Sequence, residues 1–444
     1  MSVVVAPATP LARSALGVVR LTGTGALDIA TAVCRLHHAA PVLPRRVRRV
    51  SFQDADGVFD DGMLLYFRGP DSVTGEDVVE LTCHGNPVVM QTLIAACIAR
   101  GARMAEAGEF TRRAVVNGKM DLVAAEGVHT AIEASGRAGL SIARAALEGA
   151  HSKHYDGLRT GLCIAGAELE ARLDQPGDAL ATEDDDAVIQ RIVAVVDEAV
   201  RLGRTTDRAR QLVDGARVAL VGETNAGKSS LFNQLVGRRR ALVHDQAGTT
   251  RDVLEVRTRV GDVPITLLDT AGERVTTDPV EAAGLALAQE LVDDADLLVV
   301  VVRATPDAPS EVERTILERT ADRARVVVYN GVDVPDVAPT PPGMIATSAS
   351  TGEGIAALVD RLAQMLATSE SASGDVLIAS ERQAARLRRV AELGREAIEA
   401  LHIAGPAVSA DLLTEAVSEI DALTGADPRE GVLDALFSRF CIGK

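Results

Sequence analysis

The chain has 444 residues, a length that suits about three domains with cores of their own. Its formal net charge of −17 and its pI near 5.0 argue against capture of nucleic acid through the overall field of the protein, because a phosphate backbone would be repelled at long range. A local basic face remains compatible with binding. Aromatic residues make up only 2% of the chain, so base-stacking platforms of the kind found in RNA-binding sheets are not expected.

The apolar runs and the cysteines indicate a cytosolic, cytoplasmic protein. The longest apolar runs, such as residues 297–302, have the length of a strand and end at charges, so no membrane span is expected. The N-terminal stretch lacks the basic region and the long apolar segment of a secretory signal. The five cysteines have no metal-ligand spacing and suit reduced thiols rather than a disulfide framework. They are Cys34, Cys83, Cys97, Cys163 and Cys441.

Residues 1–118 alternate strand and helix signals, which predicts an α+β domain. Strands are expected at 3–6, 16–21, 62–67 and 78–82, and helices at 26–36 and 88–100. Between 119 and 213 the hydrophobic period becomes helical, with one apolar stripe on a long helix. The stripe consists of Leu158, Leu162, Ala165, Leu169 and Leu173.

Residues 216–368 return to alternating strands and helices, and residues 379–440 are helical again. Because the last segment is too short to bury a core of its own, we expect it to pair with the helices of 119–213. The α/β domain is then an insertion into a helical domain made of two pieces. The expected organisation is multidomain α/β, with domains at 1–118, at 119–213 with 379–444, and at 216–368.

A phosphate-binding loop opens the inserted domain. Residues 222–229 fit G-x-x-x-x-G-K-S/T, after a strand expected at 216–221 and before a helix. The glycines let backbone N–H groups converge on nucleotide phosphates, Lys228 would reach the β and γ phosphates, and Ser229 offers a hydroxyl to Mg²⁺. The loop residues expected to bind nucleotide are Asn225, Ala226, Gly227, Lys228, Ser229 and Ser230.

Three further motifs follow in the order that a GTPase requires. Residues 248–252 offer Thr250 as a switch threonine for Mg²⁺ and the γ phosphate, and a strand at 263–269, paired in a hairpin with 253–260, ends in D-x-x-G. A strand at 325–330 ends in N-x-x-D, where Asp333 can accept from both N–H groups of guanine and so favours GTP over ATP. The nucleotide contacts expected here are Gly248, Thr249, Thr250, Asp269, Thr270, Ala271, Gly272, Asn330, Asp333, Ser348 and Ala349.

Two positions depart from the usual GTPase pattern. Gly331 takes the place of the lysine in N-K-x-D, so no aliphatic stem covers the base, and we expect weaker guanine affinity with specificity intact. Glu273 follows D-x-x-G, where Ras-like enzymes carry the glutamine that positions water. A different group must therefore orient the water.

These motifs closely resemble one family, the bacterial tRNA modification GTPases known as MnmE or TrmE, over essentially the whole chain. Stretches 69–77, 83–85, 108–114 and 117–122 look like its folate-binding domain, and 440–444 is similar to its C-terminal ending. The resemblance implies an N-terminal α+β domain for tetrahydrofolate binding and dimerisation, a discontinuous α-helical domain and an inserted Ras-like P-loop G domain.

The resemblance also implies roles for individual residues. Asn225 would ligate K⁺, an ion that stands in for an arginine finger, and Glu281 would orient the attacking water. Ser229 and Thr250 would hold Mg²⁺. The loop that completes the K⁺ site and contacts the nucleotide comprises His244, Asp245, Gln246, Ala247, Gly248 and Thr249, with His244, Gln246 and Thr249 as K⁺ ligands. The tetrahydrofolate contacts would be Arg20, Glu80, Lys119 and Lys444.

Each of these roles has a plainer alternative. Asn225 also suits a turn, Glu281 also suits a solvated helix, and Glu273 competes for the catalytic role. The folate-matching cations also suit an ordinary surface. Cys441 would lie near the folate by resemblance, and its chemistry stays open between a structural and a catalytic role. Arg382, Arg386 and Arg389 share one helical face, which is either solvated or contacts tRNA or a partner.

The function implied is that of a homodimeric, K⁺-dependent GTPase working with the FAD-containing MnmG/GidA protein in a heterotetramer. It would add an aminomethyl or carboxymethylaminomethyl group at C5 of the wobble uridine of certain tRNAs, with a 5-formyl or methylene tetrahydrofolate as one-carbon donor and the partner holding most of the tRNA. Two alternatives remain. A ribosome-assembly GTPase switch would need a basic RNA-binding module, and a folate-dependent one-carbon transferase would use its G domain only for regulation.

Overall fold

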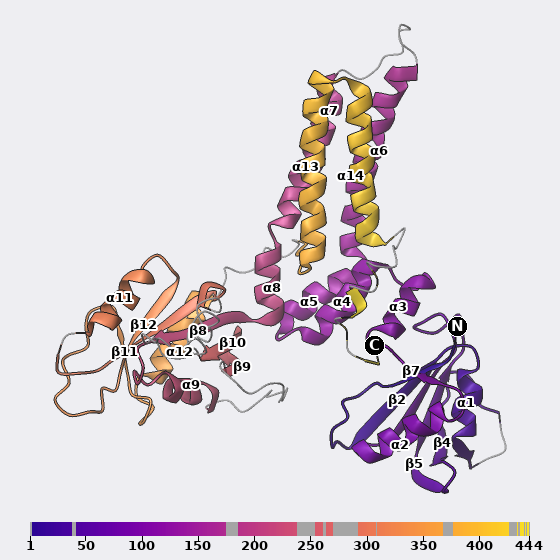
Figure 1. The fold of residues 1–444 in the computed structure, drawn as a ribbon, viewed down its shortest axis with the longest axis horizontal. Helices are drawn as coiled ribbons and strands as arrows, with labels where there is room; N and C mark the ends of the chain where they lie inside the picture. Colours follow the sequence, from indigo (N-terminus) through magenta and orange to yellow (C-terminus); the bar gives the residue numbers. More distant parts are fainter. Residues whose placement is uncertain are drawn as a thin grey trace, which may run out of the picture. The chain divides into compact units, whose positions relative to one another are not determined.

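The computed structural model describes residues 2–37, 41–174, 185–237, 254–260, 263–269, 292–307, 309–366 and 376–425, with 433, 436–438, 440, 442 and 443. Internal contacts divide the chain into two compact units, whose elements are labelled in Figure 1. Unit 1 comprises Met1–His129, Ala146–Glu198 and Arg389–Lys444, and unit 2 comprises Thr130–Ala145 and Ala199–Arg388. No helix in the described ranges combines the length and the hydropathy needed to cross a membrane.

A seven-stranded sheet forms the N-terminal part of unit 1, in the order β3-β4-β5-β6-β2-β1-β7. Neighbouring strands are antiparallel except β1 and β7, which are parallel. Helices α1 (Ala26–Ala32) and α2 (Pro87–Ile98) supply residues to the main core beside this sheet. The strands are β1 (Val4–Pro7), β2 (Leu16–Thr22), β3 (Cys34–Leu36), β4 (Arg48–Gln53), β5 (Val58–Phe67), β6 (Val78–His84) and β7 (Arg103–Met104).

The helix predicted over 26–36 is wrong in its second half. Helix α1 ends at Ala32, and Cys34 pairs with Phe52 of β4, a strand that the periodicity did not predict. Sheet pairing overrides helical patterning here because Cys34 and Phe52 are both buried in the core. The four described cysteines are free thiols, three of them buried, and burial raises the pKa of Cys34 to about 12.

The helices of unit 1 are long and pack through small residues. Helix α14 lies along α6 (Figure 1), and a Cβ on Gly394 of α13 would come 2.5 Å from Val196 of α7. Along α6 the predicted stripe is buried as far as Leu169, whereas Leu173 at the helix end is 44% exposed. The helices are α3 (Glu109–Val116), α4 (Leu122–Glu133), α5 (Arg137–Leu147), α6 (Ala150–Asp174), α7 (Asp185–Gly203), α13 (Glu381–Ile403) and α14 (Pro406–Thr424), and of these α4, α5, α7 and α13 continue into unit 2.

Unit 2 contains a six-stranded sheet in the order β13-β12-β11-β8-β10-β9. Its strands are parallel except the predicted hairpin of β9 and β10, which the structure confirms as an antiparallel edge. Alternate residues face two cores, one with α9 and α12 and the other with α11. The elements are α8 (Thr206–Asp214), β8 (Ala216–Gly222), α9 (Lys228–Gly237), β9 (Leu254–Val260), β10 (Val263–Asp269), β11 (Leu297–Arg303), α11 (Glu311–Arg319), β12 (Arg325–Asn330), β13 (Ile345–Thr347) and α12 (Ile355–Leu366).

Candidate functional site

The phosphate loop connects the end of β8 to the start of α9. Gly227 has φ +91°, and a Cβ there would lie 2.2 Å from Asn330 Nδ2, so the position accepts only glycine. Asn225 has φ +65°, in the left-handed region that asparagine adopts more readily than most residues. The geometry therefore agrees with asparagine as a turn residue, and its exposed side chain is also accessible to a ligand.

Lys228 and the serines that follow it present their polar groups at the N-terminus of α9. The Lys228 side chain is buried, and its Nζ donates to Gly222 O at 3.0 Å and to Glu223 O at 2.8 Å. Ser229 and Ser230 are exposed in the first turn. A cation, exposed hydroxyls and helix N–H groups at one point match the needs of a phosphate and its Mg²⁺.

Asn330 joins the phosphate loop to the loop that follows β13. Its Nδ2 donates to Ala226 O at 3.0 Å, and its Oδ1 accepts from Ala349 N at 3.1 Å and from Thr347 Oγ1 at 3.3 Å. The side chain is buried, so each of these hydrogen bonds forms away from water. Asn330 therefore has a structural task in addition to any contact with a base.

Asp333 lies exposed beside this junction, held by serines. Ser350 Oγ donates to Asp333 Oδ2 at 2.5 Å, and Ser350 and Ser348 oxygens lie 2.9 Å apart. Hydrogen bonds from Ser350 and then Ser348 hold the pKa of Asp333 below its usual range. Ser350 was not among the predicted contacts, and its position two residues after Ser348 is the signal that could have found it.

Gly331 follows Asn330 with φ +100°, and its N–H donates to Thr347 O at 2.8 Å. A left-handed φ of this size is strained for any residue with a Cβ. The backbone conformation therefore explains why glycine stands here, where the usual motif has a lysine whose aliphatic stem covers the base.

Asp269 ends β10, next to β8 in the parallel part of the sheet. It is 8% exposed, and its Oδ1 has no hydrogen-bond donor within the described part of the chain. A buried carboxylate oxygen without a donor is unfavourable unless a cation approaches it. The residue therefore fits the Mg²⁺ side of the site that D-x-x-G predicts.

Several predicted site residues lie outside the described residues, and their roles stay predictions. The nucleotide and K⁺ residues in this group are His244, Asp245, Gln246, Ala247, Gly248, Thr249, Thr250, Thr270, Ala271 and Gly272. The group also contains the catalytic candidates Glu273, Glu281 and Cys441, and the folate candidate Lys444.

The folate candidates Arg20 and Glu80 lie opposite each other on β2 and β6 and form an ion pair. Arg20 Nη2 is 2.7 Å from Glu80 Oε1, and the guanidinium lies 5.9 Å from the centre of the Phe110 ring. About a quarter of each side chain is exposed, at 26% and 25%. Lys119 is exposed, and its stem lies against Gly75, where a Cβ would come 3.3 Å from Lys119 Cγ.

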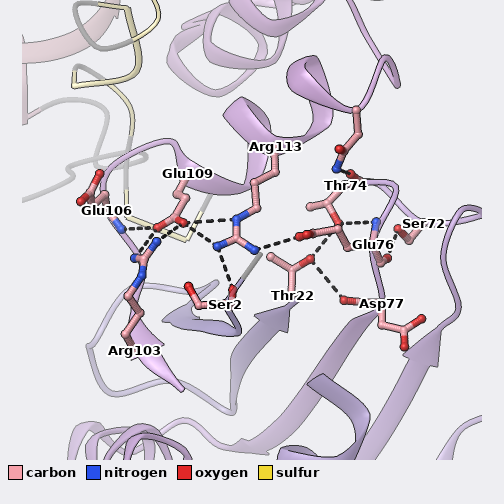
Figure 2. A network of polar contacts seen from close by, with 11 residues as sticks. Ser2, Thr22, Ser72, Thr74, Glu76, Asp77, Arg103, Glu106, Glu109 and Arg113 are labelled. Carbon is pink, nitrogen blue, oxygen red and sulfur yellow. Dashed lines mark hydrogen bonds and ion pairs between the residues drawn. The ribbon is translucent and has the colours of Figure 1, made fainter. Parts of the chain in front are cut away.

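A buried ion network fixes the family-like stretches of this domain to one another (Figure 2). Arg113 on α3 donates to Glu109 Oε1 at 2.7 Å, to Glu76 Oε2 at 2.8 Å and to Ser2 O at 3.0 Å. Arg103 donates to the other oxygen of Glu109 at 2.8 Å. Burial alone would raise the pKa of Glu109, but hydrogen bonds from Arg103, the Glu106 N–H and Arg113 lower it.

On the arginine face of α13, Arg389 forms ion pairs with glutamates. Arg389 lies 3.0 Å from Glu415, 3.4 Å from Glu396 and 3.5 Å from Glu392. Arg382 and Arg386 also have interaction partners. The ion pairs of Arg389 favour the interpretation as a solvated face over contact with tRNA or a partner.

Two family models match the chain. The model for the GTP-binding protein TrmE N-terminus matches residues 3–119, and the MnmE helical domain model matches residues 122–441. The chain is similar to the tRNA modification GTPase MnmE of Chloroflexus aurantiacus, with 39% identity over 459 residues and 99% of both chains covered. The proteins of the same name from Myxococcus xanthus and from an Azoarcus species are also 39% identical, over 444 and 457 residues, with 99% of this chain and 98% of theirs covered.

Proposed function

The chain belongs to the MnmE family of tRNA modification GTPases, and we propose that its GTP hydrolysis supports modification of C5 of the wobble uridine in certain tRNAs. The observation that carries the nucleotide part is the Asn330 junction, which holds the phosphate loop beside the loop bearing Ala349. Asp333, which accepts a hydrogen bond from Ser350, is the acceptor for guanine.

Mg²⁺ would be held by Ser229 and Thr250, with Asp269 nearby, and would neutralise charge on the phosphates. The buried Oδ1 of Asp269, which has no hydrogen-bond donor among the residues that the structure describes, supports this assignment. K⁺ would be held by Asn225 with His244, Gln246 and Thr249, and would supply positive charge in place of an arginine finger. Support for the K⁺ site comes from the exposed amide of Asn225 at the bend of the loop.

Within the chain, each group then has one task. Lys228 binds the β and γ phosphates, the amides at the start of α9 orient them, and Glu281 orients the attacking water. Glu273 is the alternative for that last role. Hydrolysis would drive opening and closing of the G domains instead of the carbon chemistry.

The N-terminal domain would bind a tetrahydrofolate derivative, 5-formyl or methylene. Arg20, Lys119 and Lys444 suit the glutamate tail, and Glu80 suits the pterin N–H groups. Because Arg20 and Glu80 already form an ion pair, the pterin must share or separate it. Cys441 is a candidate for chemistry near the one-carbon unit.

The proposed assembly is a homodimer that joins the FAD-containing MnmG/GidA protein in a heterotetramer. The partner would hold most of the tRNA, in keeping with the net charge of −17 of this chain. The proposed domains are 1–118, 119–213 with 379–444, and 216–368. Because tRNA is the proposed substrate, we place the modification reaction in the cytoplasm.

Mass spectrometry of wobble uridine in tRNA tests this function. A strain lacking the protein should lose the C5 modification, and the intact gene should restore it, whereas a gene encoding Lys228→Ala should not. Unchanged modification in the deletion strain would reject the tRNA role. Restoration by Lys228→Ala would reject the need for GTP.

A further inference from the structure

Glu223 and Ser310 connect the phosphate loop to the N-terminus of α11. Ser310 Oγ donates to Glu223 Oε2 at 2.7 Å, across 87 residues of sequence. No motif of the sequence assigns a task to either residue. The contact is the first link of a short chain of hydrogen bonds that leads from the loop to the end of β11.

The α11 end of this chain is firmly fixed. Ser310 is the N-cap of α11 and forms a capping box with Glu313. Glu313 is 5% exposed, and its Oε1 accepts from Arg303 N at 2.8 Å at the end of β11. Ser310 Oγ therefore belongs to a helix N-terminus that is hydrogen-bonded to the central sheet through Glu313.

At the phosphate loop, this series of hydrogen bonds continues to Lys228, the lysine proposed to bind phosphate. The Glu223 carbonyl accepts from Lys228 Nζ at 2.8 Å and from Ala226 N at 3.2 Å. One residue thus links its side chain to α11 and its carbonyl to Lys228. The side-chain contact therefore anchors the residue whose backbone carbonyl contacts Lys228 and Ala226.

The charge of Glu223 gives the contact a second consequence. A carboxylate in a phosphate loop repels the phosphates that the loop must bind. The Ser310 hydroxyl and the positive end of the α11 dipole both attract this carboxylate. Together they hold the Glu223 carboxylate at the N-terminus of α11, away from the position proposed for the phosphates.

We propose that Ser310 is a positioning residue for nucleotide binding, which acts by holding the Glu223 side chain at the N-terminus of α11 and so fixes the phosphate loop. The inference rests on the proposed nucleotide site, because the loop must bind GTP for its shape to matter. It adds a residue outside the GTPase motifs to that site.

A double-mutant cycle on the full-length protein measures the coupling. The dissociation constants of fluorescent GTP and GDP analogues are measured with KM and kcat for Ser310→Ala, Glu223→Ala and the double variant. Ser310→Ala, which removes the hydrogen bond and leaves the repelling carboxylate unheld, should weaken binding about tenfold, with kcat changing less than KM. Glu223→Ala removes the hydrogen bond together with the repelling charge, so it should weaken binding less. The double variant should bind no more weakly than the weaker single one, whereas additive effects would overturn the proposal.

Two further substitutions separate positioning from helix capping. Aspartate caps helices as well as serine, but Ser310→Asp places a second carboxylate against Glu223. We expect binding at least as weak as in Ser310→Ala, recovery when Glu223→Gln is added, and near wild-type binding for Ser310→Thr. Wild-type binding by Ser310→Asp would mean that Ser310 acts only as a cap.

The wild type and Lys228→Ala distinguish the two possible failures. If the wild type binds no GTP, the nucleotide site itself is wrong. If the wild type binds, Lys228→Ala does not, and every Ser310 and Glu223 variant binds like the wild type, only the positioning role is wrong. Thermal unfolding of each variant verifies that the G domain is folded before binding is compared.

Discussion

Asn330 and Ala226 lie 104 residues apart in sequence, and the Asn330 amide donates to the Ala226 carbonyl at 3.0 Å. Asn330 also pairs in parallel register with Thr347 at the ends of β12 and β13. Three segments that the proposed site assigns to different parts of one nucleotide therefore share a single buried side chain. The distance between the phosphate and base halves of the site is set by this residue.

Replacing Asn330 with alanine should weaken both binding and the G domain itself. The change removes the partner of Ala226 O, which is buried, and of the Ala349 N–H, which is half-buried. An unsatisfied buried group costs about 1–3 kcal/mol, and a half-buried one costs less. We expect GTP affinity to fall at least tenfold, as measured by calorimetry, and the melting temperature to fall. Asn330→Asp keeps the acceptor but loses the donor, so it should retain the Ala349 and Thr347 contacts and lose only the hydrogen bond to Ala226 O. Unchanged affinity in both variants would contradict the junction.

Substitutions of Gly331 separate the effect of backbone strain from the effect of the absent lysine stem. Gly331→Ala adds a Cβ at φ +100° without a stem over the base, and should lower G-domain stability by about 1–2 kcal/mol. Gly331→Lys adds the same strain and the stem, so its GTP affinity relative to Gly331→Ala measures what the stem contributes. We expect Gly331→Lys to bind GTP more tightly than Gly331→Ala, and neither to bind ATP. Equal binding of GTP and ATP by the wild type would refute guanine specificity.

The nucleotide motifs were predictable because each sits at the end of a buried strand. Lys228, Asp269 and Asn330 follow runs of apolar residues, and parallel strands bring their ends to one edge. The hairpin of β9 and β10 was predictable from the glycine and aspartate between two alternating runs. Features of this kind can be predicted from the local sequence alone.

Long-range pairing was not predictable from the same patterns. Cys34 continues a helix-like run, and only its partner Phe52 makes it a strand residue. Ser310 lies near Glu223 because α11 starts beside the phosphate loop, which no periodicity encodes. The family resemblance named Arg20 and Glu80 as separate folate contacts and did not indicate that they pair with each other.

Arg113 should be one of the residues most important for stability in the N-terminal domain. It is 4% exposed, and Arg113→Met would remove the cation that pairs with the buried Glu109 and with Glu76, whose side chain is 12% exposed. Loss of one partner of a buried pair costs about 3–5 kcal/mol. We expect this loss in the opening free energy of β2 and α3, measured by native-state hydrogen exchange on the full chain. Arg49→Met, at an exposed position on β4, is the control and should cost less than about 1 kcal/mol.

His151 on α6 should make the helical part of unit 1 sensitive to acid. It is 3% exposed, neither ring nitrogen has a hydrogen-bond partner in the described ranges, and burial lowers its pKa to about 4. His154 lowers the pKa further, and Glu126 and Asp121 oppose the shift.

The pKa of His151 is lower in the folded state than in the unfolded state. The protein therefore has its full stability above pH 6.5 and loses stability as the pH drops toward 4, because in this interval the unfolded state binds the proton more readily. The loss reaches up to about 3 kcal/mol. His151→Leu should flatten the decline of the melting temperature over this interval, whereas His402→Leu, at an exposed position on α13, should not. An identical decline in wild type and His151→Leu would assign the acid sensitivity to other groups.

Asp269→Asn should separate metal binding from folding, with opposite signs. In the absence of Mg²⁺ the change removes a buried charge whose Oδ1 has no donor among the described residues, so the G domain should melt at a higher temperature in EDTA. With GTP, the Mg²⁺ concentration for half-maximal hydrolysis should rise about tenfold or more, because a carboxylate near the metal is lost. Asp296→Asn is the matched control, since Asp296 accepts from Gln211 Nε2 at 2.6 Å and from Arg217 N at 2.8 Å. It should destabilise the domain and leave the Mg²⁺ requirement unchanged, and the same pattern in Asp269→Asn would show that Asp269 is structural.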